Sequence, residues 1–574
     1  MQPSIEEFQA DFEDLQEFYS LRWSNDRAER LRRFLVSEQS RIRSWNFQSL
    51  DQSQRIDAIL LRNFIRERLS DIFLQQRRAA EMEHLLPFAG AVQELESARV
   101  ALRTIPPRDA GQTLSVIAEQ VEKARDLARE QASGRGGRPA TASMSTPEPG
   151  GPRAGADGGA SDAPTRQPPT PSVALRAAGA VEHLREVLRR WHSHRAAFEP
   201  EFAWWTSTPF ARATKALGEY STVLREDLAG IKGKPEDPLV GDPIGREALL
   251  ESLRAEVVAL SPEELVGIGQ RELQWCQERM IEQARELGLG DDWRAALDRV
   301  KDAHVEPGEQ DDVVVKAARE SIDFLVKHDL LTIPPLTAEL WRLEMLSAER
   351  QRSLPFAAYG GLHMLVAYPT DSMTHEDKLM SMRGNNPHFT RIVTAHELIP
   401  GHHHQLMAAK RHRPDRALFR TPFFVEGWAL YWEMKLWDMN FAQTPEDRLG
   451  MLFWRAHRCA RIVVSLKFHL GEMAPAEMID YLVREVGHER ANATSEVRRF
   501  VGPDYSPLYQ CAYMIGGLQL RALHREAIAR GWKEKDFNDQ VLRYNSIPIE
   551  LLRAEMLSLE ISPEFESSWR FGEP

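Results

Sequence analysis

Pro400 and Gly401 interrupt a helical pattern between two histidines, and this interruption constrains the fold more than any other feature of the chain. The stretch reads His396-Glu397-Leu398-Ile399-Pro400-Gly401-His402-His403-His404. In an unbroken helix, at about 100° per residue, His402 would point well away from His396, and His403 would lie roughly 10 Å along the axis. Proline also removes a backbone donor and kinks or breaks a helix. We therefore expect a bulge or break at Pro400, which lets His396 and His402 converge.

The same stretch begins like the metal-binding helix motif H-E-x-x-H, in which two histidines four residues apart share a Zn²⁺ and the glutamate is the general base. Here the fourth position is Pro400, and the next histidine comes at the sixth. We predict that His396 and His402 are metal ligands, with a two-residue bulge at Pro400-Gly401 as the working geometry and His403 as the alternative ligand. The competing interpretation is an ordinary histidine-rich surface segment.

A third ligand follows at a plausible distance, in the segment Phe423-Phe424-Val425-Glu426-Gly427-Trp428. We predict that Glu426 completes the set, and that Gly427 lets its helix approach the histidine helix closely. Glu433 lies seven residues further on the same helix face, where it is either a second-sphere partner of a ligand histidine or a surface charge. Two histidines and one carboxylate predict one Zn²⁺, although Mn²⁺ or Co²⁺ fits such a donor set too.

Three protein ligands leave a fourth zinc position open for water, as catalytic sites require. Glu397 adjoins the first ligand, where its carboxylate can take the proton of the metal-bound water and pass it to a leaving amine. A donor to the developing oxyanion is also needed. The candidates left open by the sequence are the downstream tyrosines and histidines: Tyr431, His457, His469, His488 and Tyr513.

Composition limits the classes of function. The chain has 574 residues and a net charge of −12, which gives no electrostatic support to nucleic-acid binding. Three distant cysteines predict reduced, buried thiols and no disulfide framework. The sequence contains no run of about 18 apolar residues, so it predicts no membrane span. The first residues do not form a signal-peptide pattern. We therefore expect a cytoplasmic enzyme without membrane partners.

The chain is predicted to be mainly α-helical, as one large fold with at most a small β-hairpin or short sheet. Residues 1–133 form an N-terminal helical region, and residues 173–574 form the catalytic helical region. Between them, residues 134–172 are rich in Gly, Pro, Ser, Thr and Ala and are expected to be a disordered insertion or linker, an insertion being favoured.

The only convincing strand candidate lies between Leu354 and Pro369. Gly360-Gly361 is a turn signal flanked by short β-compatible runs, which predicts a hairpin shortly before the histidine stretch. The free edge of such a hairpin can pair with an extended peptide. A buried irregular connection is the alternative.

The chain resembles the bacterial domain-of-unknown-function 885 family. The resemblance rests on His396-Glu397-x-x-Pro400-Gly401-His402-His403-x-Gln405, on Glu426-Gly427-Trp428-Ala429-Leu430-Tyr431-x-Glu433, and on the weaker Tyr513-x-Ile515-Gly516. It implies a helical zincin-type fold with a deep cleft, similar to the thimet-oligopeptidase and carboxypeptidase Taq group. It also implies His396, His402 and Glu426 as metal ligands, Glu397 as base, and family roles for His469 and Tyr513.

The chain departs from the family pattern at two places. Before His469, Ser465 stands where the family has Asp, and Lys467 where it has Gly. After Tyr-x-Ile-Gly, His524 stands where the family usually has Arg. Both departures lie outside the metal motif, so they bear on substrate choice.

Together these features predict a zinc-dependent hydrolase of amide bonds, a peptidase acting on short peptides. One alternative keeps the metal but cleaves non-peptide amides or modified amino acids. The other is a catalytically inactive scaffold that binds peptides through the same groove.

Overall fold

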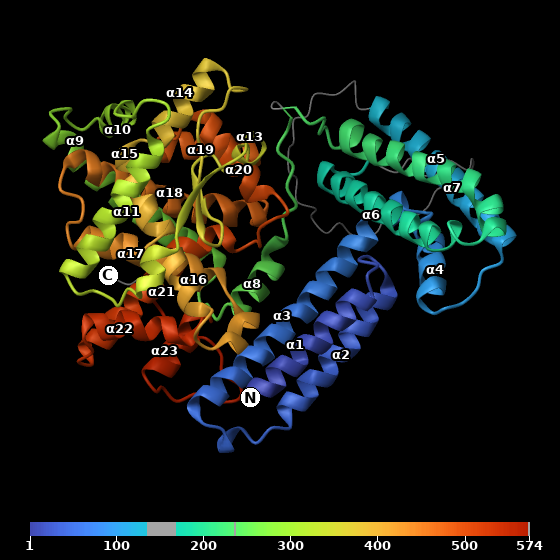
Figure 1. The fold of residues 1–574 in the computed structure, drawn as a ribbon, viewed down its shortest axis with the longest axis horizontal. Coiled ribbons are helices and arrows are strands. Elements are labelled where there is room, and N and C mark those ends of the chain that lie inside the picture. The colour runs from blue at the N-terminus through green and yellow to red at the C-terminus, as the bar shows by residue number, and fades with distance from the viewer. Residues whose placement is uncertain (135–167, 235–236, 572–574) are drawn as a thin grey trace, which may run out of the picture. The chain divides into compact units, whose positions relative to one another are not determined.

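The computed structural model describes residues 1–134, 168–234 and 237–571. Within these ranges it contains 23 α-helices and one three-stranded sheet, which confirms the prediction of a mainly α fold with a small sheet (Figure 1). All three cysteines are buried and unpaired, as expected. No described helix is both long and apolar enough to cross a bilayer.

The described chain divides into two compact units. The first comprises Met1–Phe18, Glu29–Leu74 and Gly241–Pro574, and the second comprises Tyr19–Ala28 and Gln75–Val240. Helices from both sides of the low-complexity segment pack together in the second unit. Most of the predicted segment 134–172 lies outside the described residues.

The second unit is a small helical bundle. Its helices are α4 (Ala89–Val100), α5 (Pro107–Gly134), α6 (Pro171–Ala196) and α7 (Pro200–Thr222), with the last part of α3 (Gln52–Met82). Alanine, leucine and valine side chains from α5, α6 and α7 form its core, around Trp191, Phe202 and Tyr220. The small alanines let α6 and α7 pack closely.

The first unit contains all the residues predicted to carry chemistry. It begins with α1 (Gln2–Phe18), most of α2 (Asn25–Arg43) and the first part of α3. The helices that follow are α8 (Gly245–Ala255), α9 (Pro262–Glu286), α10 (Trp293–Asp302), α11 (Gln310–Lys327), α12 (Pro335–Glu339), α13 (Ala348–Gln351), α14 (His375–Gly384), α15 (Pro387–Glu397), α16 (His402–Ala409), α17 (Pro422–Asp438), α18 (Pro445–Leu470), α19 (Pro475–Val486), α20 (Arg490–Val501), α21 (Tyr509–Ala529), α22 (Glu534–Val541) and α23 (Ile549–Met556).

Three helices, α17, α18 and α21, form the centre of this unit, and α17 is buried on nearly all sides. Its apolar residues run around the whole helix, as expected for a helix with no solvent face. The only acidic residues before its last turn are Glu426 and Glu433, both buried. A buried carboxylate needs partners, so these two side chains mark where polar groups gather.

The start of each site helix follows from local sequence. Asn386, Thr421 and Thr444 each precede a proline, and each side chain accepts a hydrogen bond from a backbone N–H of the first turn. Proline at the first helical position has no N–H to leave unpaired and already has a helical φ. These caps place the first turns of α15, α17 and α18.

The predicted hairpin is present. Strands β2 (Ala357–Tyr359) and β3 (His363–Val366) pair antiparallel, with Tyr359 opposite Met364, and Gly361 in the turn has φ +96°. The sequence did not reveal a third strand, β1 (Arg342–Met345), which pairs parallel with β3. The strand order β1-β3-β2 makes β2 an edge strand.

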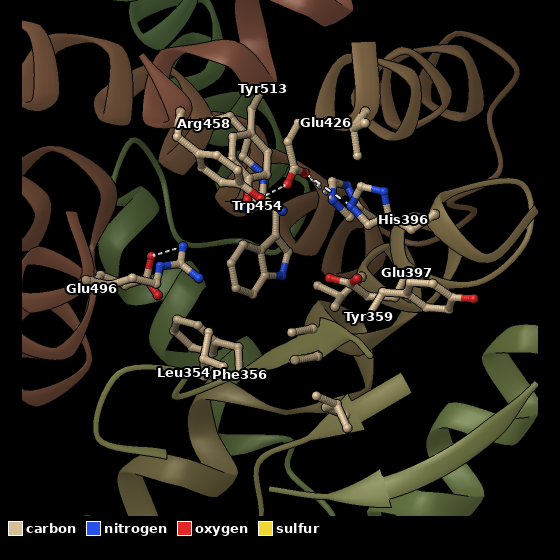
Figure 2. Close-up of a pocket in the computed structure, with 18 of the residues that line it drawn as sticks. Leu354, Phe356, Tyr359, His396, Glu397, Glu426, Trp454, Arg458, Glu496 and Tyr513 are labelled. Carbon is tan, nitrogen blue, oxygen red and sulfur yellow. Dashed lines mark hydrogen bonds and ion pairs between the residues drawn. The ribbon is translucent and has the colours of Figure 1, made fainter. Parts of the chain in front are cut away.

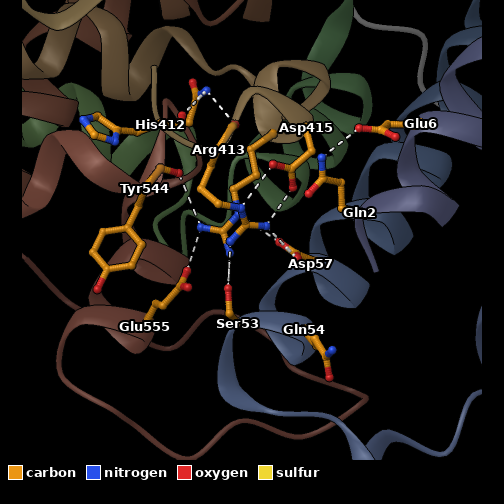
Figure 3. Close-up of polar contacts among 12 residues, drawn as sticks. Gln2, Glu6, Ser53, Gln54, Asp57, His412, Arg413, Asp415, Tyr544 and Glu555 are labelled. Carbon is orange, nitrogen blue, oxygen red and sulfur yellow. Dashed lines mark hydrogen bonds and ion pairs between the residues drawn. The ribbon is translucent and has the colours of Figure 1, made fainter. Parts of the chain in front are cut away.

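A buried ionic cluster anchors the segment between α16 and α17 (Figure 3). Arg416 is fully buried; its Nε donates to Oδ1 of Asp57 at 2.8 Å, and its Nη1 donates to Oε2 of Glu555 at 2.7 Å. Arg413 donates to the other oxygen of Asp57, at 2.8 Å. Because α16 and α17 both carry site residues, this cluster helps to hold the site together.

Candidate functional site

The helix breaks at Pro400. Helix α15 ends at Glu397, residues 398–401 form a loop that contains a cis Ile399–Pro400 bond, and α16 begins at His402. The connection is therefore a four-residue loop between two helices, and the two-residue bulge of the working geometry is wrong. A Cβ on Gly401 would lie 1.7 Å from the carbonyl oxygen of His396, so only glycine fits where the loop folds back.

The break brings the three predicted ligands together. His396, His402 and Glu426 each offer one ligand atom, and these atoms lie within 4.8 Å of one another. Oε2 of Glu426 is 3.1 Å from Nε2 of His402 and 3.5 Å from Nε2 of His396. All three side chains are buried.

These distances fit the chemistry of a zinc site. In a tetrahedral site with bonds of about 2.05 Å, two ligand atoms lie about 3.3 Å apart. The two nitrogen-to-oxygen distances, 3.1 and 3.5 Å, bracket that value. The donor set of two imidazoles and one carboxylate, with all three ligand atoms within 4.8 Å of one another, therefore suits a Zn²⁺ ion.

The charged forms of the histidines and glutamates in this group stabilise one another. Burial disfavours the charged form of His396, but the carboxylates of Glu426 and Glu433 outweigh burial and raise the pKa of His396 to about 9. Burial likewise opposes ionisation of Glu426, yet His402 and His396 hold the pKa of Glu426 well below its usual range. Glu426 is thus ionised at neutral pH, as a metal ligand must be, whereas His396 would have to release its proton when a metal binds.

Glu433 contacts a proposed ligand histidine, whereas His403 contacts residues outside the ligand set. Oε1 of Glu433 lies 2.6 Å from Nδ1 of His396, which leaves Nε2 of that ring facing Glu426. His403 is not placed to be the alternative ligand: its Nδ1 pairs with the hydroxyl of Tyr359 at 3.0 Å and its Nε2 with the carbonyl of Thr337 at 2.9 Å. One residue along α16 is a turn of about 100°, which directs His403 away from His402.

The cluster lies at the wall of a cavity of about 290 Å³ (Figure 2). Glu397 lines the same cavity beside His396, and no side chain of the described residues is hydrogen-bonded to its carboxylate. Strand β2 lines it too, through Ala357, Ala358 and Tyr359. Trp454 also lines the cavity, and Figure 2 shows its ring between Glu397 and Glu496.

Two tyrosines of α21 face the metal-ligand cluster. The hydroxyl of Tyr509 donates to Oε1 of Glu426, the oxygen that does not face the histidines. The ring of Tyr513 stacks on that of His396 at 6.1 Å between centroids, and Tyr513 lines the cavity. Burial, followed by the charge of Glu426, raises the pKa of Tyr513 to about 12, so its hydroxyl keeps its proton at neutral pH.

A glycine pair places these tyrosines. A Cβ on Gly427 would lie 2.5 Å from the carbonyl carbon of Gly516, and one on Gly516 would lie 1.9 Å from the carbonyl oxygen of Phe423. The expectation that Gly427 permits contact with the histidine helix is therefore wrong, since it permits contact between α17 and α21. That crossing lies one turn from Tyr513 and two turns from Tyr509.

The other candidates for an oxyanion donor either lie outside the cavity or are hydrogen-bonded to other side chains. His469 does not line the cavity; it is eight residues beyond Arg461, about 12 Å further along α18. Tyr431 donates to Asn538 at 3.0 Å and lies outside the cavity. His457 lines it, but its Nε2 pairs with Glu496 and its Nδ1 with His488.

The sequence did not point to several cavity residues. Tyr509 lies one helical turn before Tyr513, so the four-residue spacing within α21 was the available signal. Arg458 and Arg461 share α18 with His457, but nothing in their spacing distinguishes them from surface arginines. Trp454 resembles an ordinary core aromatic in the sequence.

Comparison with known proteins gives a family. Residues 15–556 match the family model described as a bacterial protein of unknown function, DUF885. The chain belongs to this family. No curated protein matches this DUF885 chain.

Two solved structures share the fold of this DUF885 protein. One is the "putative lipoprotein of unknown function" from Shewanella oneidensis, with a TM-score of 0.66 and 18% identity over 96% of this chain and 98% of that one. The other is the "putative lipoprotein" from Colwellia psychrerythraea, with a TM-score of 0.56 and 15% identity over 93% of this chain and 91% of that one. At these identities the likeness concerns the fold alone.

Proposed function

We propose that this DUF885 protein is a zinc-dependent hydrolase that cleaves amide bonds in short peptides. One observation carries the proposal: the ligand atoms of His396, His402 and Glu426 converge within 4.8 Å at the wall of a cavity that Glu397 also lines. A binding scaffold has no need of an unengaged carboxylate beside such a ligand set.

His396, His402 and Glu426 are the residues that would hold the metal. When bound, Zn²⁺ supplies Lewis acidity, which polarises a substrate carbonyl and lowers the pKa of water. Glu433 orients the ring of His396 through its bond to Nδ1, and Tyr509 orients Glu426 through Oε1. Because these two hydrogen bonds occupy Nδ1 of His396 and Oε1 of Glu426, the proposed ligand atoms Nε2 and Oε2 are left facing each other.

Glu397 and Tyr513 act on the substrate. The carboxylate of Glu397 takes a proton from the attacking water and later gives it to the leaving nitrogen. The protonated hydroxyl of Tyr513 donates a hydrogen bond to the carbonyl oxygen as it gains negative charge. Both side chains line the cavity that contains the ligand atoms.

The edge of β2 supports a peptide substrate. Gly360 N–H donates to the carbonyl of His363, and Ala367 N–H donates to that of Phe356, so these residues belong to the bonded pairs of the hairpin. In an antiparallel ladder the bonded pairs alternate, which directs the backbone N–H and C=O of Ala357 and Tyr359 to the free edge. An extended peptide in the cavity can pair with that edge.

The size of the cavity supports short substrates. Its volume of about 290 Å³ lies just below the usual range for small-ligand pockets, about 300–1,000 Å³. A segment of a few residues fits such a space, whereas a folded domain does not.

The test combines metal analysis with turnover. Purified protein is loaded with Zn²⁺ and incubated with a peptide library and with N-acyl amino acids, and products are identified by mass spectrometry. We expect one zinc per chain and peptide cleavage that falls at least about 100-fold in Glu397→Gln. Glu344→Gln, on exposed strand β1, is the matched control and keeps full turnover.

Either of two results would refute the proposal: a protein without stoichiometric metal, or a Glu397→Gln variant that retains wild-type turnover. Cleavage of N-acyl amino acids without cleavage of peptides would replace the peptidase with the hydrolase of modified amino acids.

A further inference from the structure

The cavity beside the metal-ligand cluster has an excess of positive side chains. Five arginines line it, against three glutamates, although the whole chain has a net charge of −12. Three of the arginines, Arg458, Arg461 and Arg499, come from α18 and α20 and surround the Tyr513 end of the cavity. A local excess of one sign in a walled cavity attracts ligands of the opposite sign.

Arg458 is the least hydrogen-bonded of these three arginines. It is 6% exposed, and its guanidinium makes no hydrogen bond within the described chain. Its nearest carboxylate is Glu433, at 3.7 Å, and that carboxylate is already bonded to His396. A buried cation without hydrogen bonds is costly, so an anionic ligand is the group that would satisfy it.

The two neighbouring arginines are held in place by other groups. Nε of Arg461 donates to Oε1 of Gln510 at 2.9 Å, while its Nη1 is buried without a partner. Nη2 of Arg499 donates to Glu496 at 3.0 Å. Gln510 is neutral, so among the described residues Glu496, the acceptor for Arg499, is the only carboxylate that accepts a hydrogen bond from any of these three guanidiniums.

The ring of Tyr513 links this positive group to the metal ligands. Its centroid lies 6.1 Å from that of His396, 4.8 Å from Cζ of Arg458 and 3.9 Å from Cζ of Arg461. The Arg458 guanidinium therefore lies within about 11 Å of the His396 ring, and one extended residue spans about 3.3–3.6 Å. Only one or two residues fit between a carbonyl at the ligand cluster and an anion at Arg458.

We propose that Arg458 binds the free C-terminal carboxylate of a peptide, so that the protein releases a single amino acid or a dipeptide from the C-terminus. The planar guanidinium matches a carboxylate with two parallel hydrogen bonds. Arg461 and Arg499 add positive potential around it. The inference rests on the proposed peptidase function, and it names the end of the substrate that this cavity recognises.

The reaction is a hydrolysis and needs no further reactant. The oxygen of water bonds to the carbonyl carbon, and the C–N bond of the last or the penultimate peptide link breaks. The proton that Glu397 takes from water goes to the leaving amine. The products are a shortened peptide with a new carboxylate and a free amino acid or dipeptide.

The first test uses the wild-type protein and a matched pair of pentapeptides with blocked N-termini. One has a free C-terminal carboxylate, and the other has the same sequence with a C-terminal amide. We expect kcat/KM to fall about 10- to 100-fold for the amide, because the charged hydrogen bonds are lost. We also expect products shortened by one or two residues. Internal cleavage at equal rates on both peptides would overturn the inference.

A third pentapeptide, an amide with aspartate as its last residue, separates the two sources of a carboxylate. Turnover as fast as that of the free acid would show that a side-chain carboxylate is the recognised group, which overturns the C-terminal assignment. Slow turnover, similar to that of the first amide, supports it.

Variants then assign the effect to Arg458. Arg458→Gln should remove the preference for the free acid, and Arg458→Lys should restore part of it, since lysine keeps the charge but not the planar pairing. Arg484→Gln, an exposed arginine on α19, is the control and should keep the full preference. An unchanged preference in Arg458→Gln would overturn the assignment. The two wild-type comparisons need no variant, so they decide the case if Arg458→Gln fails to fold.

Measurements of peptide binding, without turnover, distinguish this inference from the peptidase proposal. The dissociation constants of the free-acid and amide peptides are measured on zinc-loaded Glu397→Gln by calorimetry. Tighter binding of the free acid supports carboxylate recognition even if the wild type cleaves neither peptide, in which case the peptidase proposal alone fails. Equal dissociation constants overturn the inference while leaving metal-dependent cleavage in place.

Discussion

Glu433 and His396 face each other across two helices, with Oε1 of the carboxylate 2.6 Å from Nδ1 of the imidazole. The two residues are 37 positions apart in the chain, on α17 and α15. The bond sets the orientation of the ring and supplies negative charge behind the proposed ligand atom Nε2. It makes Glu433 a positioning residue for the metal site.

Replacing Glu433 should weaken metal binding. Glu433→Gln keeps an acceptor for Nδ1 of His396 but removes the charge, so we expect a 10- to 100-fold loss of Zn²⁺ affinity. The measurement is competition with a chromophoric chelator at constant pH. Asp438→Asn, at the exposed end of α17, is the control and should bind zinc like the wild type. Unaltered affinity in Glu433→Gln would contradict the assigned role.

A methyl group at Gly516 should separate α17 from α21. Because a Cβ there would lie 1.9 Å from the carbonyl of Phe423, Gly516→Ala must displace backbone, and overpacking of this kind costs about 1–3 kcal/mol. We expect both a lower free energy of unfolding and reduced turnover, since Tyr509 and Tyr513 move with α21. Urea denaturation and peptide cleavage measure the two effects.

The control for Gly516 is Gly179, inside α6, where a Cβ would meet no atom within 4 Å. Gly179→Ala should stabilise the protein by up to about 1 kcal/mol through helix propensity. If Gly516→Ala behaves like Gly179→Ala, the close approach of the two helices is not required.

Glu256 should make stability depend on pH. Its carboxylate accepts a hydrogen bond from the hydroxyl of Thr421, the residue that caps α17. Burial raises the pKa of Glu256 to about 8, above its ordinary value of 4.5. The folded state therefore binds this proton more tightly, so the stability contribution is complete below pH 4.5 and is lost as the pH rises through about 8.

Glu256→Gln keeps the acceptor for Thr421 but does not ionise. Relative to the wild type, its free energy of unfolding should rise between pH 5 and pH 9, by about 1.4 kcal/mol for each unit of pKa shift that is realised. Urea denaturation at pH 5, 7 and 9 tests this, with Glu251→Gln on α8 as the surface control. The same difference from the wild type at all three pH values would disprove the prediction.

The buried Arg416 should be essential for stability. Arg416→Met leaves the carboxylates of Asp57 and Glu555 without their shared partner, and breaking such a buried pair costs about 3–5 kcal/mol. Denaturation of the variant measures this loss. Arg484→Gln breaks an exposed pair with Glu485 and should change stability by less than about 1 kcal/mol. A loss of similar size in both variants would contradict the role of the cluster.

Local sequence determined the helices, the hairpin and the break in the histidine stretch. Proline after a capping residue begins α15, α17 and α18, and Gly360-Gly361 turns β2 into β3. Pro400 ends the helical pattern after Glu397 because it lacks the backbone donor, and Gly401 allows the chain to fold back. These are short-range effects, which is why the convergence of His396 and His402 was predictable from the chain alone.

Tertiary structure decided what surrounds those residues. The exclusion of His403, the pairing of Glu433 with His396 and the contact of Tyr509 with Glu426 all depend on helices that are distant in sequence. So do the glycine contact between α17 and α21 and the gathering of three arginines beside Tyr513. Residue spacing reports which face of a helix a side chain occupies, but only the packing of one helix on another determines what that face meets.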